Sequence, residues 1–185
     1  EDPQERVKEE INLQFHWYLF IMVLQYFGSL YPPSILFMLY TLIIFIPNLA
    51  NVSSFLGLFL NIGPLLAMIF MPLVLIACYL LRSYTLALIT RVLWHWSEKK
   101  VPTKDGVIPR NIPSKTLNFY HIRSFLIKYP KYHFTKGLFP WFTRWAYNFI
   151  GSNKIGENTV IEEQVCTYKY INIGKHCYIG PNGFL

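Results

Sequence analysis

The sequence predicts an α-helical multi-pass membrane domain with interfacial helices, followed by the start of a parallel β-helix. Three observations support this fold class. Residues 11–81 contain no Asp, Glu, Lys or Arg. Residues 82–154 are basic and rich in aromatic side chains. In residues 155–185 an aliphatic side chain recurs at every sixth position with one exception. A short acidic segment, 1–10, precedes these three parts.

The composition excludes a disordered chain and argues against an ordinary soluble enzyme. Hydrophobic residues make up 53% and charged residues 15% of the 185 residues, whereas a soluble domain carries roughly 25% charged residues. Disorder requires low hydrophobicity and high charge. The cysteines, Cys78, Cys166 and Cys177, form no CxxC pair and are odd in number, so they predict neither a disulfide framework nor a metal site.

The charge-free segment is long enough for three membrane spans. A spanning helix needs about 20 mostly apolar residues. We expect the spans at Ile11–Leu30, Ser34–Ala50 and Phe55–Leu81, with the first break at Tyr31–Ser34, because the Pro32–Pro33 pair interrupts helical hydrogen bonding. The second segment is short and contains Pro47, which fits either a tilted span or one arm of a re-entrant hairpin.

The distribution of Lys and Arg predicts the orientation of an integral membrane protein. Residues 82–154 carry thirteen Lys or Arg against two acidic residues. The positive-inside rule therefore places the C-terminal region in the cytoplasm. Three spans then put the N-terminus outside, and two spans put it inside.

The basic aromatic linker, residues 82–154, is expected to lie at the bilayer surface and to contact anionic lipid headgroups. Two helices are predicted: Ser114–Tyr129, with Ser114 as its N-cap and Pro130 as its end, and Pro140–Ile150. Basic and aromatic side chains also occur together on nucleic-acid surfaces. We favour lipid and predict no nucleic-acid partner, because the linker directly follows the membrane domain. The predicted membrane-interface residues are Trp94, Trp96, Arg123, Trp141, Arg144 and Trp145.

The last 31 residues have a period of six, which is typical of a parallel β-helix. Strings such as Ile-Gly-Glu-Asn-Thr-Val and Ile-Gly-Lys-His-Cys-Tyr start with the inward aliphatic residue. The aliphatic column is Ile155, Ile161, Thr167, Ile173, Ile179 and Leu185, with Thr167 as the exception. The chain begins at Glu1 rather than Met and ends inside the repeat, so we expect it to be a fragment of a longer protein.

These hexads resemble the bacterial hexapeptide-repeat acyltransferases, whose left-handed β-helix has three hexads per coil. The resemblance implies that residues eighteen apart stack, with Ile155 beneath Ile173 and Ile161 beneath Ile179. Membrane spans, a basic aromatic stretch and Phe-Pro-Trp-Phe-Thr-Arg ahead of the first hexad are similar to the membrane-bound terminal region of poly-amino-acid synthetases of the non-ribosomal type. The bulky Tyr168-Lys169-Tyr170 departs from the repeat pattern and predicts a bulge or a short loop.

The resemblance implies transfer of an acyl group from acyl-CoA or an acyl-carrier protein to a hydroxyl or amine, without a tightly bound cofactor. It also allows a homotrimer formed through the β-helix. The rival interpretation is a non-catalytic, membrane-anchored β-helix that serves as an assembly scaffold.

His176 is the candidate catalytic residue. Transferases of this family use a histidine as general base, and its near-neutral pKa suits that role. The competing interpretation is a turn residue, because the same hexad position holds Asn158 and Asn182, and Asn and His tolerate positive φ. A metal-dependent carbonic anhydrase with this fold needs several histidines, and the repeat has one. No metal site is predicted.

Overall fold

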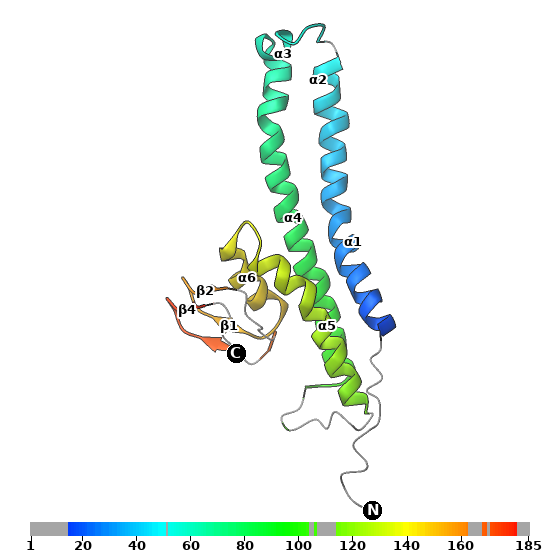
Figure 1. The fold of residues 1–185 in the computed structure, drawn as a ribbon, viewed down its shortest axis with the longest axis vertical. Helices are drawn as coiled ribbons and strands as arrows, with labels where there is room; N and C mark the ends of the chain where they lie inside the picture. Colours follow the sequence, from blue (N-terminus) through cyan, green and yellow to red (C-terminus); the bar gives the residue numbers. More distant parts are fainter. Residues whose placement is uncertain are drawn as a thin grey trace, which may run out of the picture. The chain divides into compact units, whose positions relative to one another are not determined.

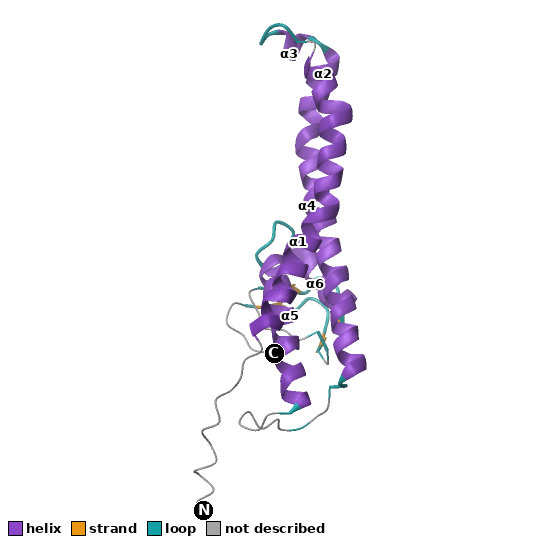
Figure 2. Ribbon diagram, turned by 90° about the vertical axis from the view of Figure 1, so that its right-hand side faces the viewer, coloured by secondary structure: helices purple, strands orange, loops and turns teal. Residues whose placement is uncertain are grey.

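The computed structural model describes residues 15–50, 52–103, 106, 114–162, 168–169 and 171–180. The predicted acidic segment, Thr167 and Leu185 lie outside these ranges. The chain divides into two compact units, which we call the hairpin unit (Phe27–Leu86) and the terminal unit (Glu1–Tyr26 with Ala87–Leu185). Figures 1 and 2 show that helices dominate the described chain and that the strands are short.

Helix α1 (Phe15–Tyr40) runs through both units and continues across the proline pair. The break expected at Tyr31–Ser34 is therefore wrong. Pro32 and Pro33 lack the N–H groups that would bond the carbonyls one turn earlier, yet the helix persists, and the Ser34 hydroxyl donates to the Leu30 carbonyl at 2.8 Å. Prolines are tolerated in membrane helices where side chains and neighbouring helices restore polar contacts.

The helix then passes through the π-helical turn η2 (Thr41–Phe45) into α2 (Ile46–Ala50). Pro47 lies just beyond this turn and cannot donate a hydrogen bond to the preceding turn. The Ile46 N–H bonds the Thr41 carbonyl, five residues back, and the Asn48 amide donates to the Ile44 carbonyl at 2.7 Å. These contacts carry the helix past Pro47, so Ser34–Ala50 is not a separate span.

Helix α4 (Ile62–Lys100) follows the short helix α3 (Gly57–Leu60). The third predicted span thus starts later than Phe55, and the helix extends well into the predicted linker. Two continuous helical segments, Phe15–Ala50 with 36 residues and Ile62–Lys100 with 39, are long and apolar enough to cross a membrane. The expectation of three spans becomes two. Both segments exceed the length needed to span, and the charge-free part of α4 ends at Leu81.

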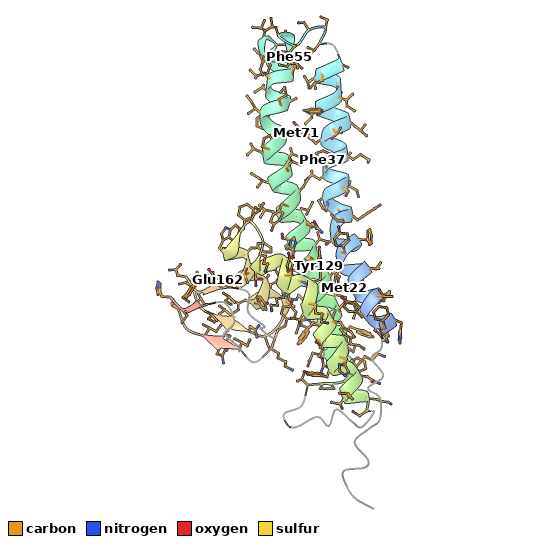
Figure 3. The ribbon with its side chains drawn as sticks, in the orientation of Figure 1. Met22, Phe37, Phe55, Met71, Tyr129 and Glu162 are labelled. Carbon is orange, nitrogen blue, oxygen red and sulfur yellow. The ribbon has the colours of Figure 1, made fainter. Side chains whose placement is uncertain are left out.

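In the hairpin unit, α1 and α4 touch through a few polar contacts. The Tyr40 hydroxyl donates to the Ala67 carbonyl, and the Cys78 thiol approaches the Pro33 carbonyl at 3.5 Å. Only 11% and 17% of the most apolar windows of the two helical segments are buried inside the structure. Apolar side chains such as Phe55, which is 74% exposed, project from the hairpin (Figure 3). A core helix of a soluble protein would be mostly buried, and lipid is the environment that suits this surface.

Helix α5 (Lys115–Thr135) belongs to the terminal unit, where it packs on the ends of α1 and α4. Its predicted start is confirmed, because the Ser114 side chain accepts a hydrogen bond from the Leu117 N–H. Its predicted end is wrong, since Pro130 lies inside the helix. Pro130 cannot bond the Leu126 carbonyl, and the buried Gln25 amide of α1 donates to that carbonyl at 3.0 Å instead.

Within its described residues, the repeat forms four two-residue strands in two parallel pairs (Figure 1). Strand β1 (Lys154–Ile155) pairs with β3 (Asn172–Ile173), and β2 (Val160–Ile161) pairs with β4 (Tyr178–Ile179). Ile155 lies opposite Ile173 and Ile161 opposite Ile179. The predicted offset of eighteen residues is therefore confirmed at both pairs, while the structure shows only short strands and not a complete β-helix.

Candidate functional site

Helix α6 (Pro140–Ile150) forms one wall of the candidate site, and its predicted bounds are confirmed. Pro140 occupies the first turn, where its missing N–H needs no partner, and Gly151 follows the last residue. One face carries a ladder of aromatic rings. Trp145 stacks on Phe149 with 4.8 Å between ring centroids, and Phe142 lies 4.7 Å from Trp145. Spacing of three and four residues places these rings on the same side of the helix.

The opposite face of α6 is buried and fixes the helix in the terminal unit. Thr143 is 1% exposed, and its hydroxyl donates to the Phe134 carbonyl of α5 at 2.7 Å. Arg91 of α4 donates to the Phe149 carbonyl at 2.9 Å, and its guanidinium lies 4.5 Å from the centroid of the Phe149 ring. Arg91 thereby satisfies a carbonyl at the C-terminal end of α6, where helical partners are missing.

The first hexad is attached to α6 by a side-chain amide. Asn148 accepts from the Ile155 N–H at 2.9 Å and donates to the Ile155 carbonyl at 3.0 Å. This paired contact imitates a neighbouring strand. Because it fixes β1 against α6, the turn between β1 and β2 comes to lie beside the aromatic face.

Two turns of the repeat that are eighteen residues apart adopt the same backbone φ. Asn158 and His176 both have φ of 56°, the left-handed region that Asn and His tolerate. The two side chains lie above one another, with 3.5 Å between Asn158 Nδ2 and His176 Nδ1. Thr159 is 6% exposed; its hydroxyl donates to the Gly174 carbonyl at 2.8 Å and accepts from the Cys177 N–H at 3.4 Å. The turns are therefore fastened to each other by side chains as well as by the strands.

A cavity of about 640 Å³ lies between the aromatic face of α6 and the turn leading into β2. We call it the α6 cavity. Its lining consists of aromatic side chains, one arginine and the turn: Trp141, Phe142, Arg144, Trp145, Asn158, Thr159 and Val160. The volume falls in the range of roughly 300–1,000 Å³ that small-molecule sites occupy. Apolar walls with a few polar groups are the usual composition of such a site.

The structure separates the predicted interface residues into two groups. Trp94 is 4% exposed and packs edge-on against Tyr168, and Arg123 is 9% exposed. Both lie inside the terminal unit, so the prediction that they face lipid headgroups is wrong. Trp96, 37% exposed, packs against Trp17 and Phe119. By contrast Trp141, Arg144 and Trp145 line the α6 cavity, and Trp141 is 63% exposed.

Arg123 takes part in a polar cluster that the sequence analysis missed. Its guanidinium donates to the Ser97 carbonyl at 3.1 Å and to the Val101 carbonyl, both at the C-terminal end of α4. Glu98 lies 3.3 Å from Arg123 Nε and 2.9 Å from Lys169 Nζ. We call Glu98, Arg123 and Lys169 the Glu98 cluster. Its one sequence signal is that Glu98 is an isolated acidic residue in a basic stretch.

The Glu98 carboxylate is stabilised in its charged form. Burial by itself raises the pKa of Glu98, but hydrogen bonds from Thr103 and Lys169 and the charge of Arg123 outweigh it, and the pKa is lowered overall. The residue lies beyond Leu81, where the charge-free part of α4 ends. The cluster ties the end of α4 to α5 and to the loop ahead of β3, and we assign it a structural role.

Neither the α6 cavity nor the rest of the described chain contains a group of three or more His, Cys, Asp or Glu that would hold a metal ion. Comparison of the chain with models of protein families, with curated proteins and with solved structures found no match. The functional argument therefore depends on the residues and their geometry.

Proposed function

We propose that the chain is a membrane-anchored acyl-transfer module, in which two helices span the bilayer and the hexads begin a left-handed β-helix. The observation that supports this most directly is the offset of eighteen residues between parallel strands, found at both pairs. Three hexads per coil give this offset, as in the hexapeptide-repeat acyltransferases that the sequence resembles. The stacked turns at Asn158 and His176 repeat the same offset outside the strands.

In this proposal His176 is the general base. Its exposed imidazole takes the proton from an acceptor hydroxyl or amine as the acceptor attacks the thioester carbonyl of acyl-CoA or an acyl-carrier protein. The bond from the carbonyl carbon to sulfur breaks, and the imidazolium returns the proton to the thiolate. A histidine suits both steps because its ordinary pKa lies close to neutrality.

The variant His176→Asn tests this role. Asn occupies the equivalent turn at Asn158 with the same φ, so the substitution leaves the backbone unstrained. We expect acyl transfer from acyl-CoA, measured by mass spectrometry on the membrane-embedded protein, to fall about a hundredfold, with an unchanged circular-dichroism spectrum. Full activity in the variant would remove His176 from the mechanism.

A non-catalytic scaffold is the second candidate, and one observation favours it. His176 and Asn158 share a left-handed turn conformation, so the backbone alone accounts for the choice of residue. A scaffold would show no acyl transfer in the wild-type protein or in His176→Asn, but it would assemble through its β-helix. Chemical cross-linking of the membrane-embedded protein would then reveal a defined oligomer, such as the trimer that the resemblance allows.

For the membrane arrangement we propose that both ends of the hairpin lie on the cytoplasmic side. Two spans bring the chain back to the side on which it started, and the excess of Lys and Arg after Leu81 selects the cytoplasm. In a background with the native cysteines replaced by serine, we expect an impermeant maleimide to label Ser54→Cys but not Ser152→Cys in intact cells. Both positions are exposed, so burial does not explain a difference between them. Labelling of position 152 from outside would reverse the assignment.

A further inference from the structure

The α6 cavity contains an arginine that no described residue of the chain neutralises. Four arginines fall within the described ranges: Arg82, Arg91, Arg123 and Arg144. Arg91 bonds the Phe149 carbonyl, and Arg123 bonds Glu98 and two carbonyls. In the described part of the chain, Arg144 has no hydrogen bond or ion pair, although its side chain is only partly exposed and lines the cavity.

Among the described residues, the two acidic side chains next to the cavity-lining turn and strand are already engaged. Glu157 pairs with Lys175 at 3.0 Å, and Glu162 accepts a hydrogen bond from the Tyr178 hydroxyl at 3.1 Å. Neither lines the cavity. The Thr159 hydroxyl is also occupied by backbone groups. Among the polar side chains that line the cavity, the Arg144 guanidinium is therefore the group left to meet a ligand, since the Asn158 amide already approaches His176 Nδ1 at 3.5 Å.

The remaining walls are apolar and aromatic. Trp141, Phe142 and Trp145 line the cavity, and Trp141 is 63% exposed. Aromatic walls favour a hydrocarbon chain, whereas a guanidinium favours a planar or tetrahedral anion that it binds through two parallel hydrogen bonds. Both features in one cavity match a molecule with both parts.

We propose that the α6 cavity binds an anionic amphiphile, a single hydrocarbon chain that ends in a carboxylate or phosphate. The anion pairs with Arg144 and the chain lies against the Trp141–Trp145 face. Arg144 suits this ligand because a guanidinium is a donor-only group and an ionised carboxylate or phosphate offers only acceptor oxygens. This site is separate from the role proposed for His176 and does not require acyl transfer.

The test uses the full chain in phosphatidylcholine nanodiscs and two quenchers of tryptophan fluorescence, ω-bromoundecanoate and the uncharged ω-bromoundecanol. We expect saturable quenching by the carboxylate, with an affinity roughly tenfold weaker in Arg144→Gln. Arg144→Lys should bind with intermediate affinity, since lysine keeps the charge without the planar fork. Inorganic phosphate alone should compete poorly, because it lacks the chain.

Two controls separate binding in the cavity from partition into the bilayer. Lys131→Gln removes a positive charge from α5 that does not line the α6 cavity, and should leave quenching unchanged. In Trp141→Phe, quenching should decrease because the reporting indole is lost. Equal quenching by the acid and the alcohol, or an affinity that Arg144→Gln leaves unaltered in a folded protein, would overturn the proposal. The proposal would also be overturned if Lys131→Gln lost as much affinity as Arg144→Gln. Binding of the carboxylate would then depend on the total charge of the protein and not on the cavity.

Discussion

Replacement of Glu98 by Gln should destabilise the terminal unit, because it removes the only carboxylate in the Glu98 cluster. The side chains of Arg123 and Glu98 are 11% and 18% exposed, and that of Lys169 is 26% exposed. Without Glu98, two cations remain close together in a partly buried site. Loss of one partner of a fully buried pair costs about 3–5 kcal/mol. The residual exposure lowers this, and we expect a loss of about 2 kcal/mol.

A second ion pair in the same chain provides the control. Lys175 and Glu157 are also 3.0 Å apart, but their side chains are 67% and 66% exposed. Solvent screens such a pair, so Glu157→Gln should cost at most about 0.5 kcal/mol. Thermal unfolding in detergent, followed by circular dichroism, should show a midpoint lowered by roughly 4–8 °C for Glu98→Gln and little change for Glu157→Gln. Equal shifts of the unfolding midpoint in the two variants would refute the argument that burial sets how much an ion pair contributes to stability.

The pH dependence of this difference has a defined sign. The pKa of Glu98 is lowered in the folded protein, so its stabilising effect is complete above the pKa of the unfolded chain, about 4.3. The effect disappears as the pH falls through the folded-state pKa. The wild-type protein and Glu98→Gln should therefore differ most at neutral pH and converge in acid. A difference that grew below about pH 4 would contradict the assigned shift.

Two further substitutions test how helices and coils are held. Gln25→Leu should cost about 1–3 kcal/mol, because it leaves the Leu126 carbonyl buried without a donor. This cost should shrink in a Pro130→Ala background, where a new backbone N–H can reach that carbonyl; a double-mutant cycle of unfolding free energies measures the coupling, and strict additivity would exclude it. Gly156→Ala should disrupt the paired coils, because its Cβ would lie 2.6 Å from the Gly174 backbone, whereas a Cβ at Gly174 meets only Cys177 Sγ, at 3.7 Å. Hydrogen exchange of residues 150–180 should rise in Gly156→Ala and not in Gly174→Ala, and equal rises would count against stacking as the cause.

Local signals in the sequence were sufficient for the parts that depend on neighbouring residues. The Ser114 cap, the bounds of α6 and the period of six in the repeat all follow from short patterns, and the structure agrees with each. The offset of eighteen residues does not follow from the period of six alone. It came from the resemblance to the hexapeptide-repeat transferases, which have three hexads per coil.

The prolines show where sequence reasoning failed. Each predicted break assumed that a proline leaves a carbonyl without a donor. At Pro130 the donor is Gln25, which is 101 residues from Leu126 in the chain. No local pattern reveals such a partner. The predicted number of spans, three, was too high for a related reason. The helix that begins at Phe15 also continues past Pro32, Pro33 and Pro47.

The candidate site illustrates a second limit. Residue type alone grouped two tryptophans and two arginines at a membrane surface. They are Trp94, Arg123, Trp141 and Arg144. The structure buries the first two and leaves the last two on a cavity. The difference arises from neighbours: the Ser97 and Val101 carbonyls near the end of α4 engage Arg123, while Arg144 is only partly exposed and lines the α6 cavity.

Side-chain contacts also explain how α6 is held beside the first hexad. The Lys154 and Gly156 N–H groups point to the second coil, where they bond the Ile171 and Ile173 carbonyls. The intervening Ile155 backbone points the other way and would be an unpaired sheet edge, which favours unwanted association. Asn148 covers it with an amide that pairs both the N–H and the carbonyl. Helix α6 thus covers the outer edge of β1 through Asn148, and Trp141, Phe142 and Trp145 of the same helix line the α6 cavity together with the turn that leads into β2.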